Sequence, residues 1–423
     1  MSTILLRICI ASSFCLIFSP LNIFAQGTWQ TRAPLPTPRT EVAVAELNGK
    51  IYVFGGFLAN GAATNVVEVY DIAPDRWTTV TSLPAAIHHI GAATANEKIY
   101  AVGGLGSGFG PVNTLDEYDP ASNQWTRKAN LPVARGAMAV AVVDKKIYAI
   151  GGQKPNVVAA DDNAVYDPQT DSWKILAPIP TAREHVAAAA INGKVYVVGG
   201  RRGSLASNRR TLEVYDPALD QWRSLPDMPT ARGGLAAAAL NGRLYVYGGE
   251  ANSGTFNQNE EFDPLTETWR SLAPMPTARH GLGAVSFNGR IYVIGGGPQP
   301  GLFVSNANEV FTPPPTQVDE SVVAIKNFHL FQNYPNPWKR SAPFPQTLIR
   351  YQLPQTSSVR VTIYNALGQL TRTLLPAQMQ TAGEYSLYWD GLDDHGQNAG
   401  NGIYFYRLEA EKQVAWRKLI ILE

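Results

Sequence analysis

Cysteine is almost absent from this chain of 423 residues. Its two copies, Cys9 and Cys15, fall in the first 25 residues, where Arg7 precedes an apolar stretch and a cleavage signal follows. We therefore expect residues 1–25 to be a signal peptide. A mature chain that begins at Gln26 would contain no cysteine, which excludes disulfide bonds and thiolate chemistry.

The chain also lacks an excess of charge and a long uninterrupted apolar run. It has 35 basic and 34 acidic residues, and loss of Arg7 with the signal peptide would make the numbers equal. A neutral chain has no overall attraction to nucleic acid or to an anionic membrane, so neither is expected as a partner. Serine and Pro20 break the N-terminal apolar stretch, so no transmembrane segment is expected in the mature form.

What the chain does have is a repeat. The pair Gly-Gly occurs six times at steps of 47 to 49 residues, beginning at Gly55, Gly103, Gly151, Gly199, Gly248 and Gly295. A tyrosine lies three residues before each pair and a second aromatic residue follows it. In the first five copies a tryptophan comes seven residues after that aromatic. Self-similarity at this period predicts one supersecondary unit copied around an axis.

One copy shows how the unit folds. Residues 41–47 alternate small and apolar side chains and would form the innermost strand, after which Asn48-Gly49 predicts a tight hairpin turn. The segments KIYVFGG, VVEVYD and RWTTVTSLP would supply three further strands. Four antiparallel strands make one twisted blade, and six blades close into a ring. Innermost strands such as HVAAAAI are small because six of them crowd around the axis.

These motifs resemble the kelch repeat, as in GKIYVFGG followed by VEVYDIAPDRW. The resemblance implies an all-β, six-bladed kelch β-propeller, which we place at residues 26–312. The sixth copy has no tryptophan, whereas Trp29 near the N-terminus precedes a Leu-Pro pair like those that end the fourth strand of the first two copies. We therefore expect the N-terminal strand to complete the last blade and to fasten both ends of the domain together.

Departures from the repeat are the functional candidates, because a feature present in every blade is structural. Arginine recurs thirteen residues before the repeat tyrosine in five copies, which favours a structural role such as pairing with the backbone of a neighbouring blade. These are Arg39, Arg135, Arg183, Arg232 and Arg279. The next two positions are not repeated. In kelch domains that bind peptides they line the mouth of the central channel, and the resemblance implies the same here.

The residues at this mouth are titratable. The catalytic candidates, for acid–base and carboxylate-binding roles, are Arg183, Glu184 and His185. The ligand-binding candidates at the same positions are Glu41, His88, His89 and His280. Such a cluster would suit acid–base chemistry or a metal if the side chains converge. The alternative is a set of polar groups solvated around a water-filled channel.

No metal and no other cofactor is expected. The sequence offers neither a His-x-x-x-His motif nor a cysteine pair with ligand spacing. Copper oxidase chemistry of the galactose-oxidase kind is excluded, since that kelch family needs a cysteine cross-linked to tyrosine. A second ligand-binding candidate is the arginine-rich loop of the fourth copy, which contains Arg201, Arg202, Arg209 and Arg210. This loop would hold a carboxylate or sulfate, or would simply be solvated.

The last hundred residues differ in composition. A proline-rich linker at residues 313–327 precedes residues 328–423, where short alternating strands and glycine-rich turns fit a small Ig-like β-sandwich. Several motifs follow in order: Asn333-Tyr334-Pro335-Asn336-Pro337, Tyr364-Asn365, Leu367-Gly368-Gln369, Trp389-Asp390-Gly391 and Gly402-Ile403-Tyr404. They resemble the type A sorting domain of the type IX secretion system. The alternative is a permanent Ig-like adhesive module.

The sorting-domain resemblance implies the type IX machinery as a partner, export through the periplasm, and a location outside the cell or on its outer surface. For the propeller, variable loops on a regular scaffold favour a binding module for a glycan or a protein on the loop face. A carbohydrate enzyme, such as a sialic-acid mutarotase-like epimerase, is the first alternative. A structural surface protein without a small-molecule site is the second.

Overall fold

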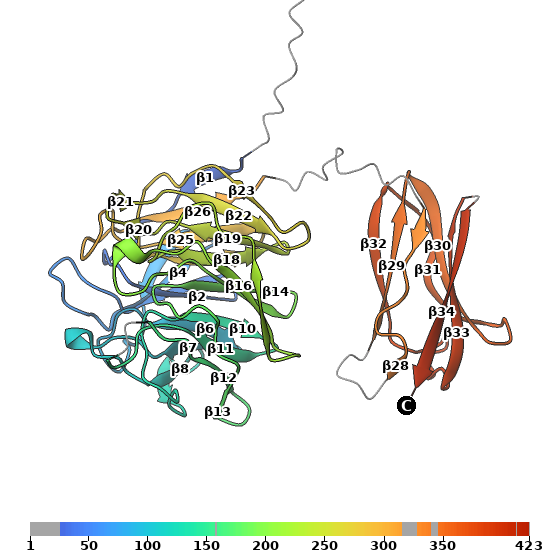
Figure 1. Cartoon of the computed structure of the whole chain (residues 1–423), viewed down its shortest axis with the longest axis horizontal. Helices are drawn as coiled ribbons and strands as arrows, with labels where there is room; N and C mark the ends of the chain where they lie inside the picture. The colour runs from blue at the N-terminus through green and yellow to red at the C-terminus, as the bar shows by residue number, and fades with distance from the viewer. Residues whose placement is uncertain (1–25, 157–158, 315–327, 340–345, 412, 423) are drawn as a thin grey trace, which may run out of the picture. The chain divides into compact units, whose positions relative to one another are not determined.

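The computed structural model describes residues 26–156, 159–314, 328–339, 346–411 and 413–422 (Figure 1). The expected signal peptide and nearly all of the expected linker lie outside these residues. The chain divides into two compact units, Met1–Pro315 and Thr316–Glu423, which we describe separately. Within the described ranges, no helix is long and apolar enough to cross a membrane.

The first unit contains six antiparallel sheets of four strands each, so the predicted all-β, six-bladed propeller is confirmed. Blades one to three are β2 (Ala43–Leu47), β3 (Lys50–Phe54), β4 (Val67–Asp71) and β5 (Arg76–Thr79); β6 (Gly91–Ala95), β7 (Lys98–Val102), β8 (Leu115–Asp119) and β9 (Gln124–Arg127); and β10 (Ala139–Val143), β11 (Lys146–Ile150), β12 (Asn163–Asp167) and β13 (Ser172–Ile175).

Blades four to six follow the same order. They are β14 (Ala187–Ile191), β15 (Lys194–Val198), β16 (Leu212–Asp216) and β17 (Gln221–Leu225); β18 (Ala236–Leu240), β19 (Arg243–Tyr247), β22 (Asn259–Asp263) and β23 (Thr268–Ser271); and β24 (Gly283–Phe287), β25 (Arg290–Ile294), β26 (Asn308–Thr312) and β1 (Thr28–Thr31).

Strand β1, the first of the chain, is the outermost strand of the last blade (Figure 1). It pairs antiparallel with β26, with Trp29 opposite Phe311. The indole N–H of Trp29 donates to the carbonyl of Ala273 in blade five at 2.8 Å. Trp77 of blade one makes the equivalent bond to Ala33 at 2.8 Å. The ring is therefore closed by the same contact that joins its other blades.

The double glycines let neighbouring blades approach each other. Gly55 and Gly56 both have positive φ, at 66° and 95°. A Cβ atom on Gly56 would lie 2.5 Å from the carbonyl oxygen of Thr40, and one on Gly55 would lie 2.5 Å from that of Ile87 in the next blade. Only glycine fits such a close backbone approach, which explains why the pair recurs in every copy.

The recurrent arginines are structural, as predicted, but their partners lie in their own blade and not in a neighbouring one. Arg39 donates to the carbonyls of Val53, Gly55 and Val66 in blade one and pairs with Glu68 at 2.7 Å. All five arginines are at most 1% exposed. Four of the five arginines pair with a glutamate, whereas Arg135 donates to the backbone carbonyls of Ala149, Gly151 and Asp162.

The second unit is a sandwich of a three-stranded and a five-stranded sheet. The first contains β27 (His329–Leu330), β29 (Thr347–Leu353) and β32 (Gly383–Trp389); the second contains β28 (Trp338–Lys339), β34 (Gln413–Leu422), β33 (Gly402–Ala410), β30 (Ser357–Asn365) and β31 (Leu370–Gln380). Trp338 and Trp389 are fully buried, with ring centroids 6.1 Å apart. Asn336 joins the start of this unit to its last strand, since its Oδ1 accepts from the N–H of Ile420 at 3.0 Å.

Candidate functional site

A ring of backbone hydrogen bonds sets the geometry of the channel mouth. Just before each innermost strand, one residue has φ between 50° and 65°; the six are Glu41, His89, Ala137, His185, Gly234 and Gly281. From His89 onward, each N–H donates to the carbonyl of the preceding ring member at 2.8–3.2 Å, and Val42 closes the ring onto Gly281 at 3.3 Å. Positive φ strains any residue that has a side chain, and such strain concentrates at functional sites.

A second tier of residues surrounds this ring. The residue before each ring member forms an isolated β-bridge with the residue that follows Gly-Gly in the same blade. These bridges are Thr40–Phe57, His88–Leu105, Gly136–Gln153, Glu184–Arg201, Gly233–Glu250 and His280–Gly297. The two tiers therefore bring two non-repeated residues and one residue after Gly-Gly from every blade to the same mouth.

The mouth holds a cavity of about 410 Å³. Its titratable lining residues come from five blades and are Glu41, His89, Glu184, His185, Arg201, Glu250 and His280. On the axis beneath the ring, alanine-rich innermost strands enclose a separate channel cavity of about 480 Å³. The volume at the mouth falls in the range of sites for small molecules, and of these two cavities it is the one in which charged side chains of several blades converge.

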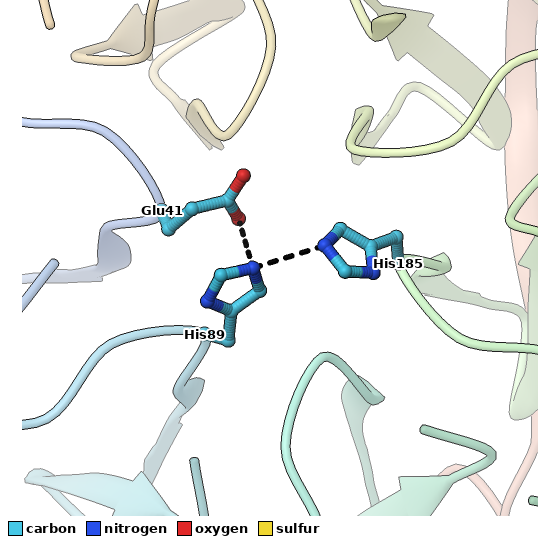
Figure 2. A group of neighbouring side chains, drawn as sticks. All are labelled: Glu41, His89 and His185. Carbon is cyan, nitrogen blue, oxygen red and sulfur yellow. Dashed lines mark hydrogen bonds and ion pairs between the residues drawn. The ribbon is translucent and has the colours of Figure 1, made fainter. Parts of the chain in front are cut away.

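Three side chains meet at the centre of this cavity (Figure 2). Nε2 of His89 lies 2.9 Å from Nε2 of His185 and 3.3 Å from Oε2 of Glu41. Their ligand atoms all lie within 4.8 Å of one another. The side chains are 6%, 10% and 11% exposed for His89, His185 and Glu41, so they are shielded but reachable. Blades two and four thus converge, which the sequence left open.

Burial lowers the pKa of His89 and holds that of His185 well below its ordinary value, and the charge of Arg201 lowers both further. Burial also lowers the pKa of His88, to about 3. These three imidazoles are therefore neutral at neutral pH. Neutral imidazole is the form that binds metals and accepts protons.

His280 has the opposite state. Burial alone would lower its pKa, but the hydrogen bond to Glu41 and the charges of Glu41 and Glu250 outweigh it, so the net shift is upward. Its Nε2 donates to the carbonyl of Gln299 at 3.0 Å, while Nδ1 lies 3.2 Å from Oε1 of Glu41. For Glu41, burial raises the pKa, but the attraction of His89 and the hydrogen bond from His280 hold it well below its usual range.

Arg201 joins two carboxylates on the wall of the cavity. It donates to Glu250 at 2.6 Å and to Glu184 at 3.3 Å, and its side chain is 12% exposed. The backbone N–H of Gly203 also donates to Glu184 at 3.1 Å. Because both carboxylates engage the guanidinium, Arg201 holds the wall together and is not available as a free anion receptor.

Apolar residues line the cavity beside these charges. Phe57 stacks on His88 with ring centroids 3.9 Å apart, and Phe109 of η1 (Ser107–Phe109) packs on the edge of His88 at 4.9 Å. Phe109 is 50% exposed and Leu302 is 46% exposed. A half-exposed aromatic beside charged groups suits a ligand with one apolar face and several polar groups.

The structure sorts the predicted residues into four groups. Glu41, His89, Glu184, His185, Arg201 and His280 line the cavity, whereas His88 lies behind His89 at 2.5 Å between their Nδ1 atoms. Arg183 is fully buried against Glu213 and is not among the residues that line the cavity, which favours the structural role of the recurrent arginines over a catalytic one.

The predicted arginine cluster is not assembled either. Arg202, Arg209 and Arg210 are exposed and do not line the cavity, and the guanidinium of Arg210 lies 3.9 Å from Asp227. They lie on either side of η2 (Leu205–Ser207), which separates them from one another along the loop.

The sequence analysis missed Glu250, Phe57, Phe109, Gln153 and Leu302. Three of these directly follow a Gly-Gly pair, namely Phe57, Gln153 and Glu250. A comparison of the six positions after Gly-Gly would have found them by the same filter for departures from the repeat. Phe109 and Leu302 lie in loops of unequal length, where no repeat position exists to compare.

The fold and the mouth define the class of protein as a kelch-type propeller with a polar site on its loop face. A family model of the Attractin/LZTR1 beta-propeller matches residues 22–258, more than half of the chain, and the chain belongs to this family. Residues 345–413 match the FlgD Ig-like domain.

A solved structure titled "Structure of YjhT" is similar to the propeller, with 16% identity and a TM-score of 0.58. The match covers 66% of this chain and 96% of that chain. Identity this low indicates the shared fold alone. A search among curated proteins finds no significant match.

Proposed function

We propose that the propeller is a binding module for a neutral saccharide at the loop-face cavity. The observation that carries this proposal is the pairing of apolar residues with converging carboxylates in a cavity of about 410 Å³. Sugar rings present C–H faces that pack on exposed aromatic side chains such as Phe109, and hydroxyl groups that donate to carboxylates. A volume of this size accommodates one or two sugar rings.

The charge of the cavity favours a neutral sugar over an acidic one. Its wall carries three glutamates, while the cations facing them are Arg201 and His280. Both cations are already paired with those glutamates, so a ligand carboxylate would meet negative charge without a free cation. This charge pattern argues against the acidic ligand expected for a sialic-acid mutarotase-like site.

The test is a binding screen with the purified chain. Neutral mono- and disaccharides and sialic acids would be compared by isothermal titration calorimetry, with Glu250→Gln as the cavity variant and Arg202→Gln as an exposed control. We expect a neutral sugar to bind and Glu250→Gln to weaken it by at least about tenfold, the worth of one charged hydrogen bond. Equal binding by both variants, or binding of sialic acid alone, would contradict the proposal.

A second candidate function is acid–base catalysis at the anomeric carbon of a bound sugar. The observation that favours it is the neutral His89–His185 pair beside the cationic His280, which places a proton acceptor and a proton donor in one cavity. The rate of anomer interconversion of any sugar that binds, followed by NMR, tests this. Catalysis predicts a lower rate in His185→Asn with binding retained, and an unchanged rate contradicts it.

For the C-terminal unit, the motifs that resemble the type A sorting domain support a proposal of export by type IX secretion to the outer surface or the medium. The Ig-like sandwich is consistent with such a domain and with a permanent adhesive module. The two differ in one measurement. Deletion of residues 328–423 in an expressing type IX host abolishes the appearance of the propeller outside the cell under the first proposal, and leaves it unchanged under the second.

A further inference from the structure

We propose that Glu41, His89 and His185 form a binding site for one divalent transition-metal ion, with Zn²⁺ as the probe. The proposal does not depend on the ligand of the cavity being a saccharide. It reverses the sequence-based expectation of no metal, which rested on the spacing of ligands along one element. In a propeller, ligands come from separate blades and share no local spacing.

Two of the three donor separations are close to those that a bound ion requires, and the third, between His185 and Glu41, is within 4.8 Å. Two imidazole nitrogens and one carboxylate oxygen are a common ligand set for zinc and for iron(II). Metal–ligand bonds of about 2.1 Å at angles between octahedral and tetrahedral put neighbouring donors roughly 3.0–3.4 Å apart. Nε2 of His89 lies 2.9 Å from Nε2 of His185 and 3.3 Å from Oε2 of Glu41, close to this range.

Contacts behind the ligands favour tautomers in which acceptor atoms face inward. The backbone of Gly106 accepts from the ring of His88, so Nδ1 of His88 is left to accept from Nδ1 of His89 at 2.5 Å. The proton of His89 is thus on Nδ1, and its Nε2 presents a lone pair.

The same holds for His185. Its Nδ1 lies against Oε2 of Glu184, and a proton on this Nδ1 would leave its Nε2 with a lone pair for a metal ion. Glu184 is in turn held by Arg201 and by the N–H of Gly203. A carboxylate that orients the far nitrogen of a ligating histidine is a recurrent support of metal sites.

The third ligand is oriented in the same way. Oε1 of Glu41 faces Nδ1 of the cationic His280 at 3.2 Å, which leaves Oε2 to face His89. With both histidines protonated on Nδ1, three acceptors converge, an arrangement that a cation between them would stabilise. All three ligands also line the cavity, so an ion there would keep a coordination position open to a bound molecule.

The nearby cations do not oppose a divalent ion strongly. Arg201 bonds Glu184 and Glu250, and His280 lies 3.6 Å or less from Glu41 and Glu250. The three glutamates together exceed these two cations by one charge. A divalent ion would change the net charge of the cluster from −1 to +1. The magnitude of the net charge stays the same, so the site tolerates the ion.

The experiment is a competition titration of Zn²⁺ against a chromophoric chelator, using the purified full chain after removal of metals. We expect one Zn²⁺ per chain, and a visible absorption spectrum typical of bound nitrogen ligands when Co²⁺ replaces it. His89→Asn and His185→Asn should weaken Zn²⁺ by more than about 100-fold, since even a supporting residue contributes about 10–100-fold. Glu184→Gln should weaken Zn²⁺ binding by about 10–100-fold, as expected for a supporting residue.

Asparagine is chosen because it tolerates the positive φ of these two ring positions. The matched control is His395→Asn, an exposed histidine of the second unit, which should leave Zn²⁺ affinity unchanged. If a ring variant does not fold, the rise in Tm of the unsubstituted chain on adding Zn²⁺, absent in Glu41→Gln, gives the same answer. No stoichiometric binding, or binding unchanged in both histidine variants, overturns the proposal. The assay contains no sugar, so its outcome is separate from that of the saccharide screen.

Discussion

His89 and His185 meet across the channel mouth, with their Nε2 atoms 2.9 Å apart, although 96 residues separate them in sequence. Blade three lies between their blades, and at the two positions before its innermost strand it has only Gly136 and Ala137. Ala137 lines the small hollow beneath both imidazoles. Because Gly136 has no side chain and Ala137 has only a methyl group, blade three leaves the space in which the two histidines reach each other.

Substitution of Arg201 should destabilise the propeller. Arg201→Gln would leave Glu184 and Glu250 without the cation that both contact, and loss of one partner from a buried ionic network costs about 3–5 kcal/mol. Urea unfolding measures this loss. Arg202→Gln, the exposed neighbour, should change the free energy of unfolding by about 0.5 kcal/mol or less. Equal effects of the two variants would argue against a role of Arg201 in the wall.

Arg183 should behave as a structural residue with a specific partner. Arg183→Met leaves Glu213 buried and unpaired, so we expect a loss of about 3–5 kcal/mol in the free energy of unfolding. The double variant Arg183→Met/Glu213→Leu should recover much of that loss, because no uncompensated charge remains. A catalytic Arg183 would instead give a stable but inactive single variant, with no recovery in the double variant.

The stabilising contribution of His280 should depend on pH. Its folded-state pKa is raised above the unfolded value of about 6.5, so its contribution is complete below pH 6.5 and is lost as the pH rises through the folded-state pKa. The difference in free energy of unfolding between the unsubstituted chain and His280→Gln should therefore be larger at pH 6 than at pH 9. A difference that is constant or grows with pH would show that His280 is not held as the cation.

The repeat made the fold predictable from sequence. Six Gly-Gly pairs and their aromatic residues reveal the number of blades, and the missing tryptophan of the sixth copy points to Trp29 as its replacement. Each of these signals reflects a local steric or hydrogen-bonding need that recurs identically. Repetition thus separates structural residues from the rest, as the buried Arg39 and Arg183 illustrate.

The site was predictable only in part, because it depends on closure of the ring. The filter for non-repeated residues found His89 and His185, but no spacing along the chain reveals that blades two and four bring them together. A metal site was not predicted because its ligands lie in different blades and have no characteristic spacing in the sequence. Arg201 and Arg202 are adjacent arginines that no sequence pattern distinguishes. Arg201 faces two glutamates because its backbone forms a β-bridge with Glu184, whereas Arg202 is exposed.

Closure of the ring by β1 gives a matched comparison of two tryptophans. Trp29 bonds the carbonyl of Ala273, and Trp77 makes the same bond to Ala33, so the same blade-to-blade contact occurs at the closing blade and at an ordinary one. Full burial of a tryptophan is worth about 3–5 kcal/mol against alanine, and we expect about 2 kcal/mol or more for these half-buried rings. Trp29→Ala and Trp77→Ala should lower the free energy of unfolding by similar amounts in urea.

If Trp29→Ala leaves the free energy of unfolding unchanged while Trp77→Ala is destabilising, the N-terminal strand does not fasten the last blade in solution. If Trp29→Ala costs much more, closure contributes stability beyond a single blade contact, because it holds both ends of the domain.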